Sequence, residues 1–184
     1  MAAMKIRRAV IADIPAVMQI ESVSFAPQIQ ESEETFVKRV TVFPDGFYVL
    51  EREGTVCGYL TCEIWAENSI DGDSFLLGHD IAEKHSEKGT VLYVSSLALL
   101  PEHRSRGDGS KFFWECIGKI VSLYPEINKS VLIVNENWNS ARRIYFNSGY
   151  RETDRLENFF FDGDAIVMEK NYDRSAVEGF FRFP

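Results

Sequence analysis

A basic, glycine-containing turn follows an apolar segment near the middle of the chain and has the composition of an anion-binding site. The apolar segment ends in Leu97, Ala98 and Leu99, and the turn contributes Arg104, Ser105, Arg106, Gly107, Asp108, Gly109 and Ser110. Glycine adopts backbone angles closed to other residues, so the N–H groups of such a turn can converge on an anion at the positive end of the following helix. The two arginines add charge that the backbone cannot supply. We therefore predict that this turn binds a pyrophosphate.

The spacing within the turn separates it from two other phosphate-binding motifs. It lacks the Gly-x-x-x-x-Gly-Lys-Ser/Thr sequence of a P-loop and the third glycine of the dinucleotide fingerprint. Its own pattern, Arg-x-x-Gly-x-Gly after a strand that ends in Leu-x-Leu-x-Pro, resembles the acetyl-coenzyme A binding motif of the GNAT superfamily of N-acetyltransferases. The resemblance implies acetyl-CoA as cosubstrate, bound by the turn and by the backbone of residues 97–99.

A second segment, residues 137–150, is similar to the family pattern Asn-x-x-Ala-x-x-hydrophobic-Tyr-x-x-x-Gly-Phe. Asn137 and Asn139 each miss the expected asparagine position by one residue, so either could contact the cofactor. Asn139 could equally cap the helix that follows. The resemblance implies that Tyr145 is the general acid that protonates the departing thiolate of coenzyme A. A phenol suits this role because it is close to an alkyl thiol in acidity and stays protonated at neutral pH.

The general base is less clear from the motifs, because the fourth strand lacks the glutamate that many family members carry there. Tyr93 and Ser95 lie on one face of that strand instead. This arrangement is similar to the arylalkylamine N-acetyltransferases, in which side chains two apart at these positions hold a water chain that removes the proton. A hydroxyl relays a proton but is a poor base, so we expect Glu21, Glu63 or His79 to complete the relay. The alternative for Tyr93 and Ser95 is an ordinary strand pair.

Composition narrows the class of partner. The chain has 184 residues with 45% hydrophobic content, which fits a single domain over residues 1–172 followed by an aromatic tail, residues 173–184. Its net charge of −8 argues against nucleic acid or an anionic membrane as partner and favours a cationic small molecule. Acidic residues near the expected substrate mouth could attract an ammonium group; they are Glu31, Glu33, Glu34, Asp71, Asp73 and Glu83.

The cysteine spacing and the hydropathy of the chain indicate whether it contains a metal site, a membrane span or a signal peptide. The three cysteines form no Cys-x-x-Cys pair, and no His/Cys/Asp cluster has the spacing of metal ligands, so no metal is expected. No apolar run approaches the roughly 18 residues that span a bilayer, and the N-terminus lacks the apolar segment of a signal peptide. We therefore predict a cytoplasmic protein.

The order of predicted elements is a strand, two helices, three strands, a helix, a strand, a helix and two strands. Strands are expected over residues 6–10, 47–51, 56–64, 91–99 and 130–134, and two more strands meet at residues 162–164. Helices are expected after Asp13, from Ser32, from the glycine turn to about Pro125 and over residues 140–147. Residues 67–88 are predicted to form a long loop. The order matches the GNAT acyl-CoA N-acyltransferase fold, an α/β fold with a mixed sheet of about seven strands flanked by about four helices.

These observations favour an acetyl-CoA-dependent N-acetyltransferase in which a primary amine attacks the thioester directly. The expected acceptor is a small arylalkylamine or a polyamine. Two alternatives remain open: acetylation of a protein N-terminus or lysine, and a non-catalytic acyl-CoA binding module. The chain is expected to be a monomer or a homodimer.

Overall fold

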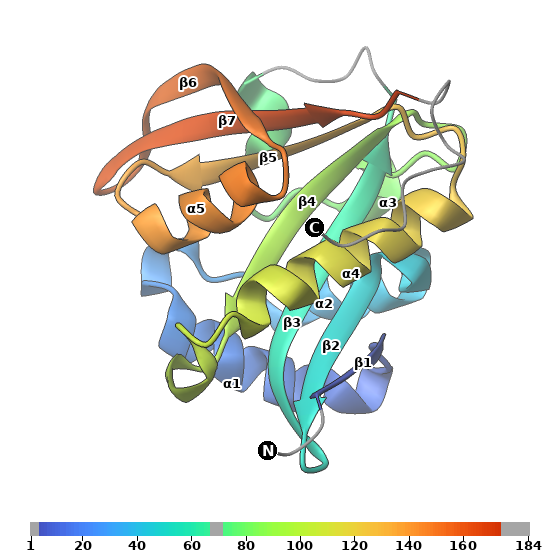
Figure 1. Ribbon diagram of the computed structural model, residues 1–184, viewed down its shortest axis with the longest axis vertical. Coiled ribbons are helices and arrows are strands. Elements are labelled where there is room, and N and C mark those ends of the chain that lie inside the picture. The colour runs from blue at the N-terminus through green and yellow to red at the C-terminus, as the bar shows by residue number, and fades with distance from the viewer. Residues whose placement is uncertain (1–3, 67–71, 174–184) are drawn as a thin grey trace.

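The computed structural model describes residues 4–66 and 72–173, and it contains a seven-stranded mixed sheet (Figure 1). The strand order is β1-β2-β3-β4-β5-β7-β6, and only the β4–β5 pair is parallel among the described strands. This confirms the predicted α/β fold. The strands are β1 (Met4–Arg8), β2 (Phe47–Arg52), β3 (Thr55–Trp65), β4 (Val91–Leu99), β5 (Lys129–Asn135), β6 (Arg151–Phe160) and β7 (Gly163–Asn171).

Helices cover both faces of the sheet (Figure 1). One face is covered by α1 (Ile14–Ser24) and α2 (Glu33–Val42), and the other by α4 (Asp108–Leu123) and α5 (Asn139–Asn147). These are the four helices that the sequence predicts. A fifth, α3 (Ile81–Lys84), is a single turn within the predicted long loop, of which residues 67–71 lie outside the described residues. The predicted aromatic tail also lies outside them from residue 174 onward.

Local signals explain most of the element boundaries. The β2–β3 hairpin turns at Glu53 and Gly54, whose φ angles of 50° and 77° are those of the hairpin turn that the sequence predicts. Ser32 caps α2, because its hydroxyl accepts a hydrogen bond from the Thr35 N–H at 3.2 Å. The sequence predicts the first strand over residues 6–10, but the strand ends at Arg8. It ends there because the Val10 N–H donates to the Asp13 carboxylate at 2.9 Å and begins a helical turn instead.

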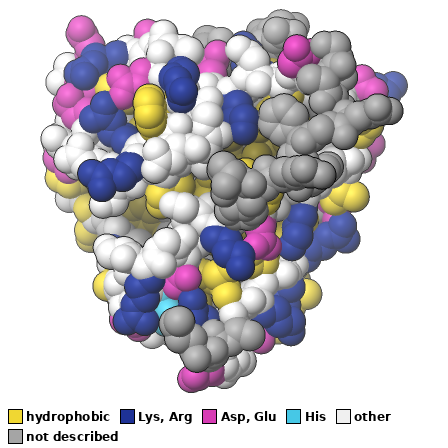
Figure 2. Space-filling view, viewed as in Figure 1, with side chains coloured by type: hydrophobic (Ala, Val, Ile, Leu, Met, Phe, Trp, Pro, Cys, Tyr) yellow, Lys and Arg dark blue, Asp and Glu magenta, His cyan; other side chains and the backbone are white. Residues whose placement is uncertain are grey.

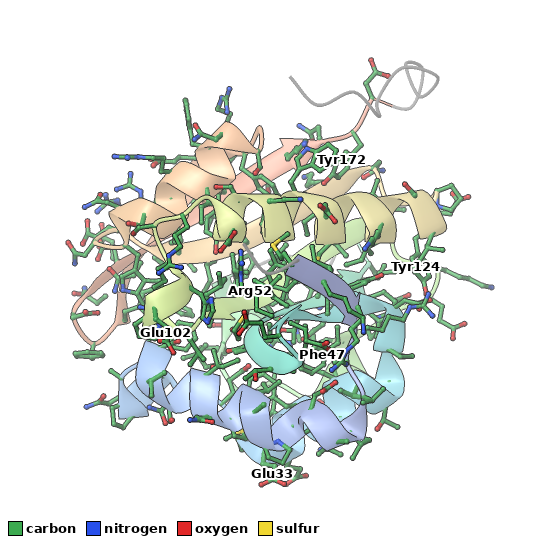
Figure 3. All side chains as sticks on the ribbon, turned by 60° about the horizontal axis from the view of Figure 1, so that its bottom comes forward. Glu33, Phe47, Arg52, Glu102, Tyr124 and Tyr172 are labelled. Carbon is green, nitrogen blue, oxygen red and sulfur yellow. The ribbon has the colours of Figure 1, made fainter. Side chains whose placement is uncertain are left out.

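Two apolar layers hold the helices on the sheet. Glu33 lies on the outer side of α2, whereas Phe47 lies in the layer between the sheet and the α1–α2 pair (Figure 3). The α1–α2 layer includes Ile14, Val17, Ile20, Phe36, Val49 and Ala98, and the α4–α5 layer includes Leu92, Val94, Leu99, Phe113, Ile117 and Tyr145. Side chains of β4 enter both layers. This strand therefore connects the two halves of the core.

Strand β4 changes its partners along its length. Its register with β5 consists of three pairs, the last being Tyr93↔Val131, after which the two strands separate. On the other side its register with β3 shifts between Thr61 and Cys62, which leaves Ser95 as an extra, bulged residue. The bulge places the side chains of Ser95 and Ser96 on the same face, where their hydroxyls contact Thr61 and Tyr59 of β3. Beyond Tyr93 and Val131 a wedge therefore opens between β4 and β5.

Charges of both signs are interspersed over the face that carries α4 and α5 (Figure 2). Around α5, Arg142 pairs with Glu152, and Arg155 lies 3.0 Å from Glu136 and 2.7 Å from Asp164. Arg142 and Arg155 are therefore both paired with acids. Within the described ranges, no helix has the length and apolar character needed to cross a bilayer.

Candidate active site

A cavity of about 90 Å³ lies in the wedge where β4 separates from β5. Tyr93, Ser95 and Leu97 of β4 line it, and Tyr145 lines it from α5. The fold thus brings together four of the predicted site residues. Ser96 lines the same cavity because of the bulge. Sequence reasoning missed Ser96, although two adjacent serines in an otherwise apolar strand were a signal that the pattern changes there.

The cavity reaches both faces of the sheet. Tyr145 belongs to the α4–α5 layer, whereas the carboxylates of Glu21 and Glu31 enter from the α1–α2 side. Its remaining walls are largely apolar and include Phe25, Ile29, Leu77, Trp138 and Phe160. The cavity is therefore lined by polar side chains from both faces of the sheet and by aromatic side chains between them.

A larger groove of about 800 Å³ runs along the outer side of α4. It is lined by Tyr48, Trp114 and Tyr172 and adjoins Asp173, the last described residue. None of the sequence-predicted site residues lines it. We therefore place the candidate site in the smaller cavity, which contains the chemically relevant side chains.

Tyr145 is held rigidly at the wedge. It is buried, and its ring packs against Phe113 of α4 with centroids 5.1 Å apart and against Tyr150 at 6.3 Å. Burial raises the pKa of its phenol well above the usual range. The hydroxyl consequently stays protonated at neutral pH, the state that a general acid requires.

Tyr93 belongs to an aromatic cluster on the α1–α2 side of the sheet. Its ring stacks on Trp65 with centroids 4.1 Å apart and lies 6.0 Å from the ring of His79. Burial raises the pKa of this phenol too, so it remains a neutral hydroxyl. Tyr93 therefore provides a closely packed wall of the candidate site.

Ser95 makes a closed pair with its neighbour on β3. Its Oγ lies 2.8 Å from Thr61 Oγ1 and donates to the Thr61 carbonyl at 3.1 Å. A carbonyl oxygen accepts but cannot pass a proton on. Both polar contacts of the Ser95 hydroxyl are therefore with Thr61.

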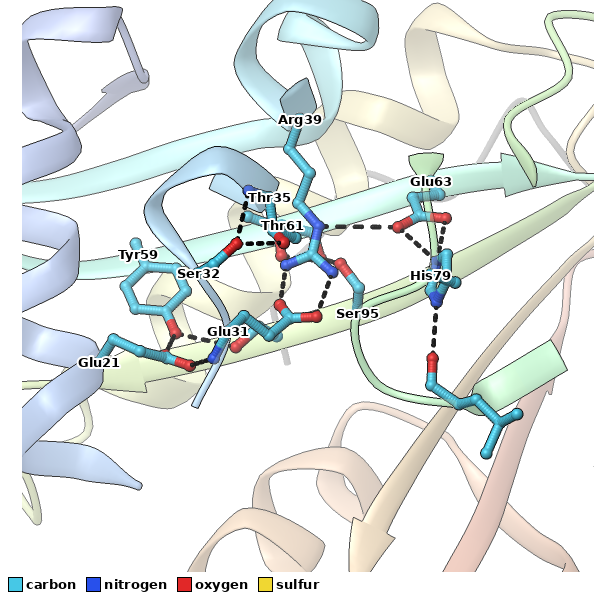
Figure 4. Close-up of polar contacts among 12 residues, drawn as sticks. Glu21, Glu31, Ser32, Thr35, Arg39, Tyr59, Thr61, Glu63, His79 and Ser95 are labelled. Carbon is cyan, nitrogen blue, oxygen red and sulfur yellow. Dashed lines mark hydrogen bonds and ion pairs between the residues drawn. The ribbon is translucent and has the colours of Figure 1, made fainter. Parts of the chain in front are cut away.

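The predicted relay residues Glu63 and His79 form a buried ion pair (Figure 4). His79 Nε2 lies 2.8 Å from the Glu63 carboxylate, and Nδ1 lies 2.9 Å from the Leu76 carbonyl. Because both partners only accept, both ring nitrogens must donate and the imidazole is in its charged form. Glu63 also accepts from Trp65 Nε1 at 2.8 Å and lies 3.7 Å from Arg39 Nε. The pair holds the loop after β3 against the sheet.

The Glu63–His79 pair makes stability depend on pH. Burial lowers the pKa of His79, but the hydrogen bond and charge of Glu63 raise it, and the net shift is upward. A group whose pKa is raised by folding stabilises the protein fully below its ordinary value and loses this contribution as pH rises through the folded-state value. Replacing His79 with Gln should therefore cost more unfolding free energy at about pH 6 than at about pH 9.

Urea unfolding of both proteins at the two pH values measures this difference. The exposed Lys88→Gln variant controls for the loss of a surface charge near the same loop. An equal loss of unfolding free energy for His79→Gln at both pH values would show that folding does not raise the pKa of His79.

Glu31 and Arg39 form a second buried pair that borders the cavity. Both guanidinium NH groups of Arg39 contact the Glu31 carboxylate, one of them at 2.8 Å, and Arg39 is 2% exposed. The sequence identifies Glu31 only as an acid near the mouth and does not single out Arg39. The amphipathic pattern of α2 gives no signal for a buried arginine.

Glu21 is the carboxylate of this network whose oxygens contact no cation among the described residues. One oxygen accepts from the Glu31 N–H at 2.9 Å, and the other accepts a short hydrogen bond from the Tyr59 hydroxyl. Burial raises the pKa of Glu21 despite these two donors. Tyr59 Oη in turn lies 3.0 Å from Ser96 Oγ (Figure 4).

The glycine turn leads into α4 as predicted. Ser105 and Gly107 have φ angles of 61° and 84°, and no side chain caps the first turn of α4. The first N–H groups of the helix are therefore available to an anion. Arg104 fixes the turn in place, because its Nε donates to the Leu99 carbonyl at 2.8 Å and its NH2 to Ser24 Oγ at 2.9 Å. The residues present fit the pyrophosphate of coenzyme A.

Five further predicted residues lie in the turn, in the first turn of α4 or in β4. Asp108 pairs with Arg52 at 2.8 Å, and Gly109 packs so closely on α5 that an added Cβ would lie 3.2 Å from Ile144 Cδ1. Arg106 and Ser110 are exposed on the turn, and Ala98 is buried under α1. Glycine at 109 therefore permits the contact between the two helices.

The two candidate asparagines flank the cavity without lining it. Asn137 donates to the Asp162 carbonyl at 3.2 Å and supports the β6–β7 turn. The expectation that Asn139 caps α5 is wrong. Asn139 is the first residue of the helix, Trp138 holds the capping position, and no side chain makes a capping bond. The N-terminus of α5 is formed by backbone contacts such as Asn139 N–H to the Asn137 carbonyl at 3.0 Å.

Residues 14–150 match the family described as Acetyltransferase (GNAT) family. The chain belongs to this family. It is also 30% identical over 159 residues to an uncharacterized N-acetyltransferase of Methanocaldococcus jannaschii, with 86% of this chain and 85% of the relative covered. This GNAT protein is therefore an acetyl-CoA-dependent N-acetyltransferase, and acetyl-CoA is its cosubstrate.

Solved structures show the same fold. The loading GNATL domain of CurA from Lyngbya majuscula aligns with a TM-score of 0.78 at 14% identity, covering 92% of this chain and 98% of that domain. The protein yncA of Salmonella typhimurium, solved with its cofactor acetyl-CoA, aligns with a TM-score of 0.69 at 19% identity and covers 95% and 97% of the two chains. At these identities the likeness extends to the fold alone.

Proposed function

We propose that this GNAT protein acetylates the primary amine of a small arylalkylamine. The observation that supports the acceptor class is the cavity at the β4–β5 wedge, which combines aromatic walls with the carboxylates of Glu21 and Glu31. Among the described residues only Glu31 is neutralised by a guanidinium, that of Arg39, so an ammonium group in the cavity would compensate the carboxylate of Glu21. The aromatic side chains would contact the apolar part of the same molecule.

The cavity volume limits the acceptor. At about 90 Å³ it is much smaller than the roughly 300–1,000 Å³ of ordinary ligand pockets. It has room for the reacting groups and a short acceptor. The volume therefore excludes a folded protein segment from the cavity, and the aromatic walls are the feature that favours a small arylalkylamine.

We assign the predicted residues the following roles. The acetyl-CoA thioester supplies the electrophilic carbonyl, and Tyr145 donates its phenolic proton to the leaving sulfur. The first turn of α4, with Arg106 and Ser110 beside it, binds the pyrophosphate, and residues 97–99 offer backbone groups to the pantetheine arm as an added strand would. Tyr93 and Ser95 shape the acceptor side, and Asn137 or Asn139 contacts the cofactor from the start of α5.

Thiol release from acetyl-CoA tests the proposal across 2-phenylethylamine, spermidine and a peptide with a free N-terminus. We expect turnover with 2-phenylethylamine to exceed that with the peptide by at least about tenfold in kcat/KM, or about 1.4 kcal/mol. Hydrolysis without any amine gives the background. Preferential turnover of the peptide or of spermidine would overturn the acceptor class, and no turnover above background would overturn the amine transfer itself.

A further inference from the structure

A row of hydroxyl groups leads from the cavity into the core on the α1–α2 side. Ser96 lines the cavity, its Oγ lies 3.0 Å from Tyr59 Oη, and Tyr59 contacts the Glu21 carboxylate (Figure 4). Tyr59 is fully buried and Glu21 is 2% exposed. Glu21 also borders the cavity, but both of its oxygens already accept hydrogen bonds, so the row is the connection by which a proton from the reacting centre reaches this carboxylate.

The direction of each hydrogen bond in the row follows from the groups involved. Tyr59 has one hydroxyl hydrogen, and it points to Glu21, because a carboxylate only accepts. In the contact between Ser96 and Tyr59, Ser96 must then be the donor. The lone pairs of Ser96 Oγ are left to accept a hydrogen bond from a group in the cavity. All donors are thus aligned from the cavity toward Glu21.

Neither of the neighbouring polar groups offers this alignment. The polar contacts of Ser95 are with the hydroxyl and the carbonyl of Thr61, and they lead to no carboxylate among the described residues. His79 already carries both protons in its pair with Glu63. Unlike Ser95 and His79, the row from Ser96 to Glu21 ends at an acceptor with capacity for one more proton.

We propose that the acceptor ammonium loses its proton through Ser96 and Tyr59 to Glu21, an inference that rests on the proposed function. The ammonium N–H bond breaks as Ser96 Oγ accepts its proton, Ser96 passes its own proton to Tyr59, and Tyr59 passes its own to Glu21. The amine keeps the electron pair and attacks the thioester carbonyl. As the C–S bond breaks, the sulfur takes the phenolic proton of Tyr145, and the second proton of the attacking nitrogen restores that phenol. Glu21 becomes a carboxylic acid, and the row returns the proton to water in the cavity after the product leaves.

The surroundings of Glu21 suit a proton acceptor. Its titratable and charged neighbours are Tyr59 of β3, Glu31 before α2 and Arg39 within α2. Burial, with a smaller contribution from the Glu31 charge, raises the pKa of Glu21, while Tyr59 and Arg39 act in the opposite direction. The carboxylate is consequently a stronger base than an exposed glutamate. In this proposal Glu21 accepts the proton through the hydroxyls of Ser96 and Tyr59 and does not itself contact the reacting atoms.

Two acceptors that differ in basicity test the row. At neutral pH 2-phenylethylamine is almost entirely an ammonium, whereas the fluorines of 2,2-difluoro-2-phenylethylamine strongly lower the pKa of its ammonium and leave much of it neutral. We expect Glu21→Gln and Ser96→Ala to lower kcat for 2-phenylethylamine by about tenfold to a hundredfold. Both should lower kcat for the difluoro amine by less than about threefold, because that acceptor needs little deprotonation.

The matched comparison is Ser95→Ala, which removes a hydroxyl from the same face but outside the row, and it should affect both amines equally. The loss in Glu21→Gln should also shrink as pH rises and more of the 2-phenylethylamine becomes neutral. Ser96→Ala is the decisive variant, because it should disturb folding less than Glu21→Gln does. Equal losses of kcat for the two amines in Ser96→Ala would overturn the row and leave the proposed function standing. Failure of the unaltered protein to acetylate either amine would overturn both.

Discussion

Replacing Tyr145 with Phe is expected to lower kcat for acetyl transfer by about two to four orders of magnitude. Tyr145 lines the wedge between β4 and β5, where we propose that the thioester binds, and burial keeps its phenol protonated. Its removal leaves the departing thiolate of coenzyme A without a proton donor. The aromatic ring stays and still packs on Phe113, so binding should change little.

Calorimetric binding and single-turnover kinetics separate these effects. The Kd for coenzyme A should stay within about tenfold of the original, or about 1.4 kcal/mol. Tyr150→Phe is the matched control, because it removes a buried hydroxyl that contacts Ser130 on the other side of the same ring cluster. Unchanged kcat in Tyr145→Phe would show that another group protonates the sulfur.

Replacing Arg39 with Met is expected to lower the free energy of unfolding by about 3–5 kcal/mol. The guanidinium is 2% exposed and contacts the carboxylates of Glu31 and Glu63. Met fills much of the space but leaves Glu31 buried without a cation. An uncompensated charge in a dry environment costs more than the ion pair contributes. Urea denaturation followed by far-UV circular dichroism measures the loss.

The neighbouring Lys38 provides the control, since it pairs with Glu34 and Asp80 on the surface and its side chain is 41% exposed. Lys38→Met should cost less than about 1 kcal/mol. Adding Glu31→Gln to Arg39→Met should recover part of the stability, because it removes the unpaired charge. If Arg39→Met and Lys38→Met lowered the free energy of unfolding by similar amounts, burial would not explain the contribution of Arg39 to stability.

The fold can be predicted where local signals coincide with tertiary structure. Strand β4 covers the predicted residues 91–99, because its buried apolar run ends before Pro101 and the helical turn that this residue begins. The turn at Gly107 can be predicted because glycine reaches a φ of 84° without strain. In such places the identity of a residue fixes the backbone without reference to distant partners.

The candidate site can be predicted only in part, because it depends on pairing across the sheet. The bulge at Ser95 arises from the register between β3 and β4, which no local pattern in either strand records. Arg39 sits in a helix whose residues suggest a solvated face, and its burial follows from Glu31 and Glu63 in other elements. Polar residues buried by long-range partners resemble surface residues when only the sequence is read.

The extra residue in β4 also changes the phase of the strand. Before it, Leu92 and Val94 point into the α4–α5 layer; after it, Leu99 points there and Ala98 faces α1. Without the bulge the alternation would send Ala98 toward α4 and press Leu99 against α1. One inserted residue therefore lets a single strand supply side chains to both apolar layers, and it makes this change beside the wedge that forms the candidate site.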